Sequence, residues 1–307
     1  MRVVAAGRSI EGATNMAKAN EVKQLLAFGM VLICAPAWST LFGQQGKIVL
    51  SEREKPILEQ IGKLRGMPDD ERIRTERRLA VEIRQLPAEG NKEALADSLA
   101  HLVTEGDPGR ETLQEVATTL ALAVREKAPA GDADEAYATL AEFARYEHVR
   151  VDMADDPRFA AAMAKLEAED RGRETADFTL ADLNGKNWRL KDLRGSVVLV
   201  NFWATWCPPC RKEMPDLETL YQRFGPKGLV VLAISDEEEG KVRPYIAEHH
   251  FSYPTLLDPG RKVSELFYAD GIPKSFVFNR EGKMVAQGMD MRTMKQFLEM
   301  LGSAGLE

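Results

Sequence analysis

Residues 197–211 read Val-Val-Leu-Val-Asn-Phe-Trp-Ala-Thr-Trp-Cys-Pro-Pro-Cys-Arg, an apolar run followed by two closely spaced cysteines. The run 197–203 predicts a buried strand. The residues after it carry apolar side chains at helical spacing as far as Phe224. Cys207 and Cys210 are therefore predicted to lie where a helix begins after a strand, which is the arrangement of a dithiol redox site.

A helix start suits the chemistry of such a pair. Backbone N–H groups are unpaired there and the helix dipole is positive, so the thiolate of Cys207 is favoured. Cys210 follows three residues later on the same helix face, close enough to form a disulfide. Pro208 and Pro209 fit the first turn because their missing N–H groups would have no intrahelical acceptor.

Two other interpretations of the cysteine pair are half a zinc site and a static disulfide. Zinc needs four ligands, and the remaining cysteine is the distant Cys34. None of the four histidines is spaced as a ligand pair beside the motif. Stabilising disulfides usually close longer loops. We expect a redox pair, no metal, and no cofactor besides the Cys207–Cys210 disulfide itself.

The composition is that of a folded protein long enough for two domains. The 307 residues are 44% hydrophobic and 29% charged. The net charge of −7 and the lack of a basic block argue against nucleic acid as a partner. Three cysteines are too few for a disulfide-built scaffold.

Residues 1–46 are predicted to be a signal peptide or a membrane anchor. No charge occurs between Lys23 and Lys47, residues 25–34 are strongly apolar, and a small-x-small site follows at 35–37. The alternative to cleavage is an anchor through residues 25–42, which barely reach spanning length. Either version predicts a periplasmic or extracytoplasmic protein, secreted by a cleaved signal or anchored at its N-terminus.

Residues 51–170 predict a separate all-helical domain of unknown role. They are rich in Ala, Leu, Glu and Arg, and Gly- or Pro-containing breaks separate five or six segments of helical length. Stacked helical hairpins and a plain bundle are both compatible with this pattern. Asp156 is a plausible N-cap. The charged residues 167–175 are expected to link this domain to the rest.

Residues 174–307 alternate between strand and helix patterns. Two short strands flank an Asn184-Gly185 turn, and the end of the chain has a hairpin and a last helix. Together they predict a mixed sheet covered by helices on both faces. The expected strands are 197–203, 229–235, 255–257, 275–279 and 284–287, and the expected helices are 207–224, 238–250, 262–268 and 292–301.

Residues of about 174–303 resemble the thioredoxin superfamily, and within it the TlpA/ResA-like thiol-disulfide oxidoreductases of bacterial envelopes. The matching stretches are 177–185, 193–215 and 271–282. The resemblance implies an α/β thioredoxin-like fold and protein-disulfide reductase activity on protein dithiols or disulfides. It also implies a reductant fed by a membrane electron donor, with cytochrome c maturation as one known use.

The resemblance also assigns a substrate-docking groove. In this superfamily a cis proline, here Pro273, lies against the disulfide, and the residue before it, Ile272, offers its main chain to an extended substrate. Trp206, Pro208 and Pro209 would border the same groove.

Glu213 is the third expected catalytic residue, beside Cys207 and Cys210. The family carries a partly buried acid at this position, whereas many cytoplasmic thioredoxins have a buried aspartate where Asn201 stands here. We expect Glu213 to accept the proton of Cys210. The alternative is a solvent-facing glutamate that pairs with Arg211 or Lys212.

Three other functions compete. A peroxiredoxin-type peroxidase needs a lone peroxidatic cysteine. A copper chaperone on the same fold spaces its cysteines by three residues and adds a distal histidine. The third is a partner-binding protein whose helical domain recruits partners while its redox domain is secondary or vestigial. The intact Cys207, Cys210 and Pro273 argue against this last one.

Overall fold

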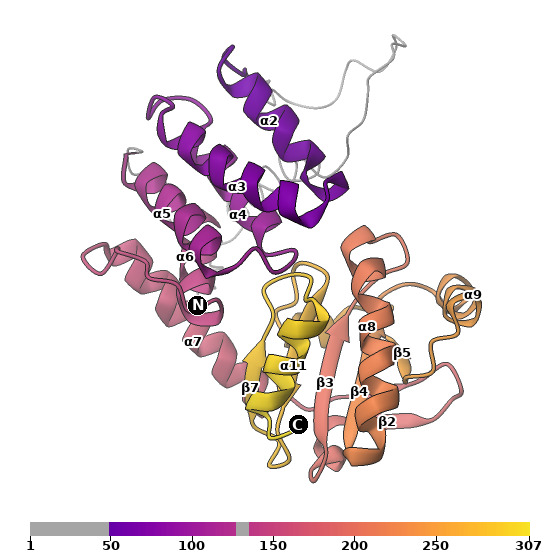
Figure 1. The fold of residues 1–307 in the computed structure, drawn as a ribbon. Coiled ribbons are helices and arrows are strands. Elements are labelled where there is room, and N and C mark those ends of the chain that lie inside the picture. The colour runs from indigo at the N-terminus through magenta and orange to yellow at the C-terminus, as the bar shows by residue number, and fades with distance from the viewer. Residues whose placement is uncertain (1–48, 127–134) are drawn as a thin grey trace, which may run out of the picture.

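The computed structural model describes residues 49–126 and 135–307 (Figure 1). The predicted signal or anchor, with Cys34, lies outside these residues. Within them, no helix has both the length and the hydropathy needed to cross a bilayer.

The N-terminal half consists of helices that pack on one another around their own core, as the Ala- and Leu-rich segments predicted (Figure 1). Each helix turns one apolar face inward, and Leu79, Leu99 and Leu120 are fully buried there. The helices are α2 (Glu54–Lys63), α3 (Asp69–Arg84), α4 (Lys92–Val103), α5 (Arg110–Glu126), α6 (Glu135–Tyr146) and α7 (Pro157–Thr175).

Residues 167–175, which were expected to link the two halves, form the last turns of α7. The helix begins where predicted, since the Asp156 carboxylate accepts the Arg158 N–H at 2.9 Å. Two of the charged residues near its end, Asp170 and Arg173, are buried and paired with each other. Arg173 binds Asp170 at 2.9 Å and also donates to the Phe267 carbonyl at 2.8 Å, so the helix docks on the C-terminal half.

A five-stranded mixed sheet lies at the centre of the part of the structure after residue 174, in the order β5-β4-β3-β6-β7. The first three of these strands are parallel, and β6 and β7 are antiparallel to their neighbours. Every residue of β3 is buried, as its unbroken apolar pattern predicted. The strands are β3 (Val197–Phe202), β4 (Leu229–Ser235), β5 (Thr255–Leu257), β6 (Lys274–Phe278) and β7 (Met284–Gln287).

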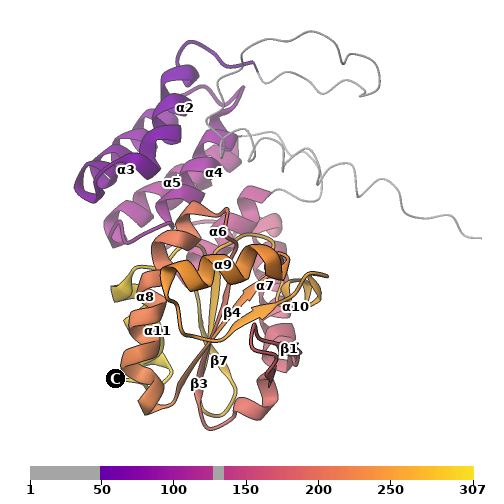
Figure 2. The ribbon, with the colours of Figure 1, turned by 90° about the vertical axis from the view of Figure 1, so that its right-hand side faces the viewer.

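Helices cover both faces of the sheet (Figure 2). One face packs against α8 (Pro208–Phe224), α9 (Glu239–His249) and α11 (Met294–Ser303). The other packs against α10 (Lys262–Leu266) and the β1–β2 hairpin. The hairpin pairs β1 (Thr179–Ala181) with β2 (Asn187–Arg189) across the predicted turn, where Gly185 has a φ of 80°.

The helical half lies against the end of the sheet at which β3 leads into α8 (Figure 1). Met289 from the C-terminal half packs into the helical core. Polar pairs surround this contact: Thr104 with Asp290 at 2.5 Å, Glu147 with Arg292 at 2.5 Å, Glu142 with Lys274 at 3.1 Å, and Asp107 with Lys295 at 2.8 Å.

Candidate active site

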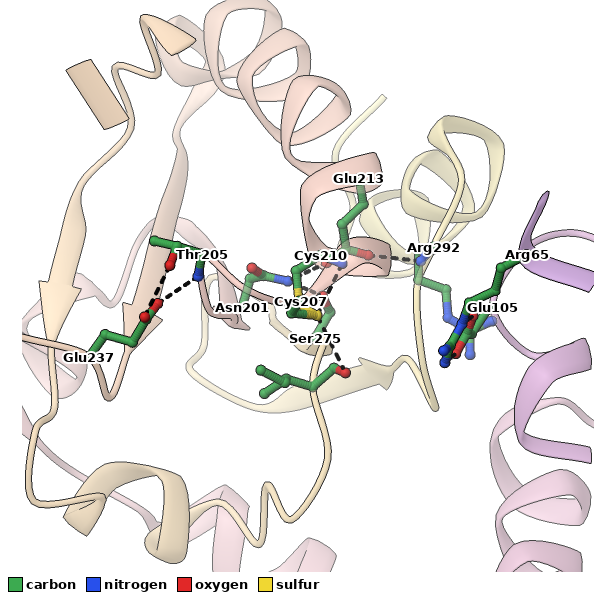
Figure 3. Close-up of a disulfide and its surroundings, with 11 residues drawn as sticks. Arg65, Glu105, Asn201, Thr205, Cys207, Cys210, Glu213, Glu237, Ser275 and Arg292 are labelled. Carbon is green, nitrogen blue, oxygen red and sulfur yellow. Dashed lines mark hydrogen bonds and ion pairs between the residues drawn. A yellow bond between two sulfur atoms is a disulfide. The ribbon is translucent and has the colours of Figure 1, made fainter. Parts of the chain in front are cut away.

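The two cysteines form a disulfide at the start of α8, with sulfurs 2.05 Å apart (Figure 3). Cys207 is the N-cap of the helix, and its Sγ accepts the Cys210 N–H at 3.3 Å. Pro208 and Pro209 occupy the first turn, as predicted. The sulfur of Cys207 thus lies at the positive end of the helix dipole, where a thiolate is stabilised.

The disulfide itself is largely buried. Cys207 is only 2% exposed, and Cys210 is fully buried. The neighbouring Trp206 is 62% exposed. The surface next to the disulfide is therefore apolar and accessible, whereas the sulfurs lie below it.

The Ile272–Pro273 peptide bond lies opposite the disulfide and is cis, as predicted. The Ile272 carbonyl oxygen is 3.7 Å from Cys207 Sγ. Pro273 is buried and Ile272 is half-buried. The predicted docking residues are thus brought together around the disulfide, with Trp206 on the helix side and Ile272 on the strand side.

Glu213 is buried beside the disulfide, so the alternative of a solvent-facing glutamate is wrong. Its side chain is 1% exposed. It lies on the same face of α8 as Cys210, which comes one turn before it. Its Oε1 accepts from Asn201 Nδ2 at 2.7 Å, and its Oε2 accepts from the Arg292 backbone N–H at 2.9 Å (Figure 3).

Burial raises the pKa of Glu213 to about 8. The hydrogen bonds from the Arg292 N–H and from Asn201, together with the positive charge of Arg292, act in the opposite direction and limit the rise. A carboxyl group with such a pKa exchanges its proton near neutral pH, which is the range in which a proton acceptor for a thiol is useful.

Asn201 connects the acid to the strands beneath it. Its Nδ2 donates to both Glu213 and Ser275 Oγ, the latter at 3.0 Å, while its Oδ1 has no hydrogen-bond partner among the described residues. The sequence marked Asn201 only as a replaced aspartate. Its role as donor to Glu213 depends on the pairing of Asn201 with Ser275 across β3 and β6, which the motif does not reveal.

Two further contacts were missed. Arg292 was expected inside the last helix, but α11 begins at Met294 with Thr293 as its N-cap, so the Arg292 N–H is free to reach Glu213. On the other side, Glu237 accepts from the Thr205 N–H at 2.6 Å and from its hydroxyl at 3.0 Å (Figure 3). This carboxylate fixes the loop that presents Trp206.

The disulfide lies at the start of a helix, and a cis proline lies opposite it. Together with the mixed five-stranded sheet, these features define a thiol–disulfide site on a thioredoxin-like fold. The sequence matches the AhpC/TSA family over residues 171–287. It is 36% identical over 126 residues to the thiol-disulfide oxidoreductase ResA of Bacillus thuringiensis, covering 41% of this chain and 73% of that protein. The ResA of Bacillus subtilis is 34% identical over 128 residues, with 41% and 72% covered.

Among solved structures, a thiol:disulfide interchange protein of the thioredoxin family from Chlorobium tepidum matches with a TM-score of 0.39 and 27% identity, over 42% of this chain and 92% of that one. The chain belongs to the ResA-like thiol-disulfide oxidoreductases of the thioredoxin superfamily. It is a thiol-disulfide oxidoreductase. The AhpC/TSA match begins at residue 171, so it does not cover α2–α6.

Proposed function

We propose that Cys207 is the attacking cysteine, Cys210 the resolving cysteine, and Glu213 the proton acceptor for Cys210. The observation that carries this assignment is the buried Glu213 carboxyl group one turn beyond a disulfide at a helix start. The sulfur of Cys207 lies at the positive end of the α8 dipole, because Cys207 is the N-cap. Cys210 is fully buried and lies on the same helix face as Glu213.

In the reducing direction the Cys207 thiolate attacks one sulfur of a substrate disulfide, and the other substrate sulfur leaves as a thiolate. Cys210, once it has lost its proton to Glu213, attacks Cys207 Sγ. The mixed disulfide breaks, the substrate leaves with both sulfurs reduced, and Cys207–Cys210 is oxidised. Two electrons pass to the substrate, and the proton held by Glu213 returns to solvent or to the departing thiolate.

The substrate docks as an extended segment across Trp206, Pro208, Pro209, Ile272 and Pro273 in this proposal. Ile272 is half-buried beside the sulfur, so its main chain can pair with a passing strand. Trp206 supplies exposed apolar surface on the other side.

We infer that the protein works as a reductant outside the cytoplasm, fed by a membrane electron donor, and that apocytochrome c is one substrate class. The family resemblance and the apolar N-terminal segment 25–42 support this. The direction of electron flow depends on two opposed effects, because a stabilised Cys207 thiolate favours oxidation of substrates and an ionised Glu213 favours their reduction.

The test of the cysteine roles is a trapping experiment with Cys210→Ser. Without the resolving thiol, mixed disulfides between Cys207 and client proteins should accumulate and should be released by dithiothreitol. The matched control is the double variant Cys207→Ser/Cys210→Ser, which should trap nothing. Equal trapping by both variants, or none by Cys210→Ser, contradicts the proposed roles.

A peroxidase would give a different result. Its cycle consumes peroxide at a lone cysteine, whereas here both sulfurs are joined at the helix start. We expect the reduced protein to consume hydrogen peroxide no faster than a free dithiol does. Rapid peroxide turnover that survives Cys210→Ser would favour the peroxidase instead.

A further inference from the structure

One of the contacts between the helical half and the redox site is a buried ion pair. Glu147 follows α6, and its Oε1 lies 2.5 Å from Arg292 Nη2. The two side chains are 7% and 6% exposed. The same Arg292 donates its backbone N–H to Glu213 Oε2 at 2.9 Å. A single residue thus touches the helical half with its guanidinium and the acid of the redox site with its main chain.

The position of Arg292 is closely determined. A Cβ atom at Gly288 would meet Arg292 Nε at 2.8 Å, so the side chain lies directly on that glycine. The segment that follows is fixed by the capping box of Thr293 and Gln296. On the helical side, α6 is anchored by the fully buried Phe143. The pair therefore joins two well-packed elements.

Other charges nearby do not replace Glu147. Arg65 and Glu105 bind each other at 2.5 Å, and Asp290 accepts from the Thr104 hydroxyl. Among the described residues, the titratable groups that interact with Glu213 itself are Asp216 on α8 and Tyr253 before β5. The two cysteines do not titrate while they form the disulfide. Arg292 is the cation that acts on Glu213 from the segment before α11.

We propose that Glu147 and Arg292 are positioning residues through which the helical half determines how readily Glu213 takes up a proton. The inference rests on the proposed role of Glu213 as proton acceptor. Glu147 does two things to Arg292: it holds the guanidinium in place, and it neutralises much of its charge. Without Glu147, the uncompensated positive charge would favour the ionised form of Glu213.

The experiment is a titration of Glu213 in the oxidised full chain. Neither sulfur titrates in the disulfide, so the titration of Glu213 is not coupled to that of the cysteines. Glutamate labelled with ¹³C at the carboxyl group gives the signal, and its absence in Glu213→Gln assigns it. In the wild-type protein we expect the midpoint at about pH 8.

Glu147→Gln keeps a hydrogen-bond acceptor for Arg292 and removes only the charge, so the midpoint should fall by about one pH unit. The double variant Glu147→Gln/Arg292→Met removes both charges, so no unpaired charge stays buried. It keeps the backbone N–H of residue 292 that donates to Glu213. Its midpoint should rise above that of the wild type. A fall of the midpoint in the single variant and a rise in the double variant are opposite shifts, which a loss of packing does not produce.

The matched control is Glu142→Gln, the same change in the neighbouring ion pair with Lys274, whose side chains are 20% and 10% exposed. It should leave the midpoint unchanged. The proposal is overturned if Glu147→Gln behaves like Glu142→Gln, or if Glu147→Gln and the double variant shift the midpoint in the same direction.

The proposed function is judged separately, from the pH profile of thiol–disulfide exchange in the same variants. If the titration midpoints of Glu213 move as expected but the pH profile of exchange does not change, the effect of Glu147 and Arg292 on Glu213 is upheld. The role of Glu213 as proton acceptor is then rejected. Midpoints that do not move reject the coupling, whatever the exchange profile shows.

Discussion

At the scale of single residues, the site depends on one acid held away from water. Glu213 is 1% exposed and accepts two hydrogen bonds, yet its pKa stays at about 8 because burial outweighs both donors. Near neutral pH the group is therefore mostly protonated. It accepts a proton from Cys210 more readily as the pH rises.

Glu213→Gln should slow the resolving step. The amide cannot take the Cys210 proton, so release of substrate from the mixed disulfide should fall by about 100-fold at pH 7. Rapid-quench measurements of mixed-disulfide decay test this, and attack by Cys207 on a small disulfide should change much less. An unchanged decay rate would remove Glu213 from the mechanism.

The same residue should make stability depend on pH. Its pKa is 4.5 in an ordinary environment and about 8 in the folded protein, so between these values the folded state keeps a proton that the unfolded state releases. Stability should then decrease as the pH rises across this window, by about 1.4 kcal/mol per pH unit from this group.

Guanidinium unfolding of the oxidised protein between pH 5 and 8, a range of about three pH units, measures this slope. Glu213→Gln is the control, because the amide does not titrate, and its curve should be flatter by that amount. Parallel curves for the two proteins would show that Glu213 is ionised in the folded state throughout.

Sequence reasoning found the residues whose chemistry is visible in a motif. Cys207, Cys210 and Pro273 are carried by spacing and by family resemblance, and Glu213 by its distance from Cys210. Asn201, Ser275 and Arg292 contact Glu213 or its donor only because strands and loops far apart in the chain come together. Their types are common ones, so the sequence carries no signal for these contacts.

At the scale of elements, the loop between β3 and α8 is held from one side. Glu237, 8% exposed, accepts two hydrogen bonds from Thr205 and so fixes the residue before Trp206. This explains how a largely exposed tryptophan can have a defined place beside the disulfide.

Glu237→Ala should therefore weaken the docking of protein substrates. It leaves the Thr205 N–H without its acceptor, which costs about 1–3 kcal/mol in stability or is avoided by a rearranged loop. We expect a several-fold higher KM for a protein disulfide and an unchanged rate with dithiothreitol, which does not need Trp206. Asp236→Ala, beside it in sequence and paired with Arg261, is the control. Equal effects on both substrates would argue against a docking role.

The elements themselves were largely predictable. The strands β4, β5 and β7 have the predicted bounds, because apolar or β-branched runs end at clear turn residues. The last turns of α7 were not predicted. The charged composition of residues 167–175 is typical of a loop. The burial of Arg173 against the Phe267 carbonyl, which stabilises these residues as the end of a helix, cannot be read from the sequence.

At the scale of the whole molecule, α7 joins the two halves with a buried polar network. Asp170 accepts from Arg173 and from the Tyr146 hydroxyl at 2.9 and 2.8 Å, and Arg173 continues to the Phe267 carbonyl. The guanidinium also lies 5.5 Å from the ring centroid of Phe276. The network spans α6, α7, β6 and the segment after α10.

Arg173→Met should therefore lower the stability of the full chain. The substitution removes the side-chain donor to the Phe267 carbonyl and one partner of Asp170. We expect this to lower the free energy of unfolding by about 2–4 kcal/mol. Lys165→Met, on the same helix but in an ion pair whose lysine is 75% exposed, should cost less than about 1 kcal/mol. Urea unfolding compares them, and similar midpoints would show that the network does not hold the halves together.

The arrangement of the halves could not be predicted. Composition and break spacing indicated a helical part before a mixed sheet, and family resemblance described the second part alone. Contacts such as Glu147–Arg292 and Thr104–Asp290 join residues more than a hundred positions apart. No local pattern encodes such pairs, so the placement of the helical half over the redox end of the sheet is known only from the structure.

The central claim is that Cys207 and Cys210 interconvert reversibly between dithiol and disulfide. The direct measurement is a redox titration. The full chain is equilibrated at a series of ratios of reduced to oxidised glutathione or dithiothreitol, the free thiols are alkylated, and the masses of the products are measured by mass spectrometry. We predict one two-electron transition that is the same from the oxidised and the reduced side, with a tenfold change in the equilibrium for about every 30 mV. A disulfide that stays closed, or a dithiol that stays open, across the whole range would contradict the account.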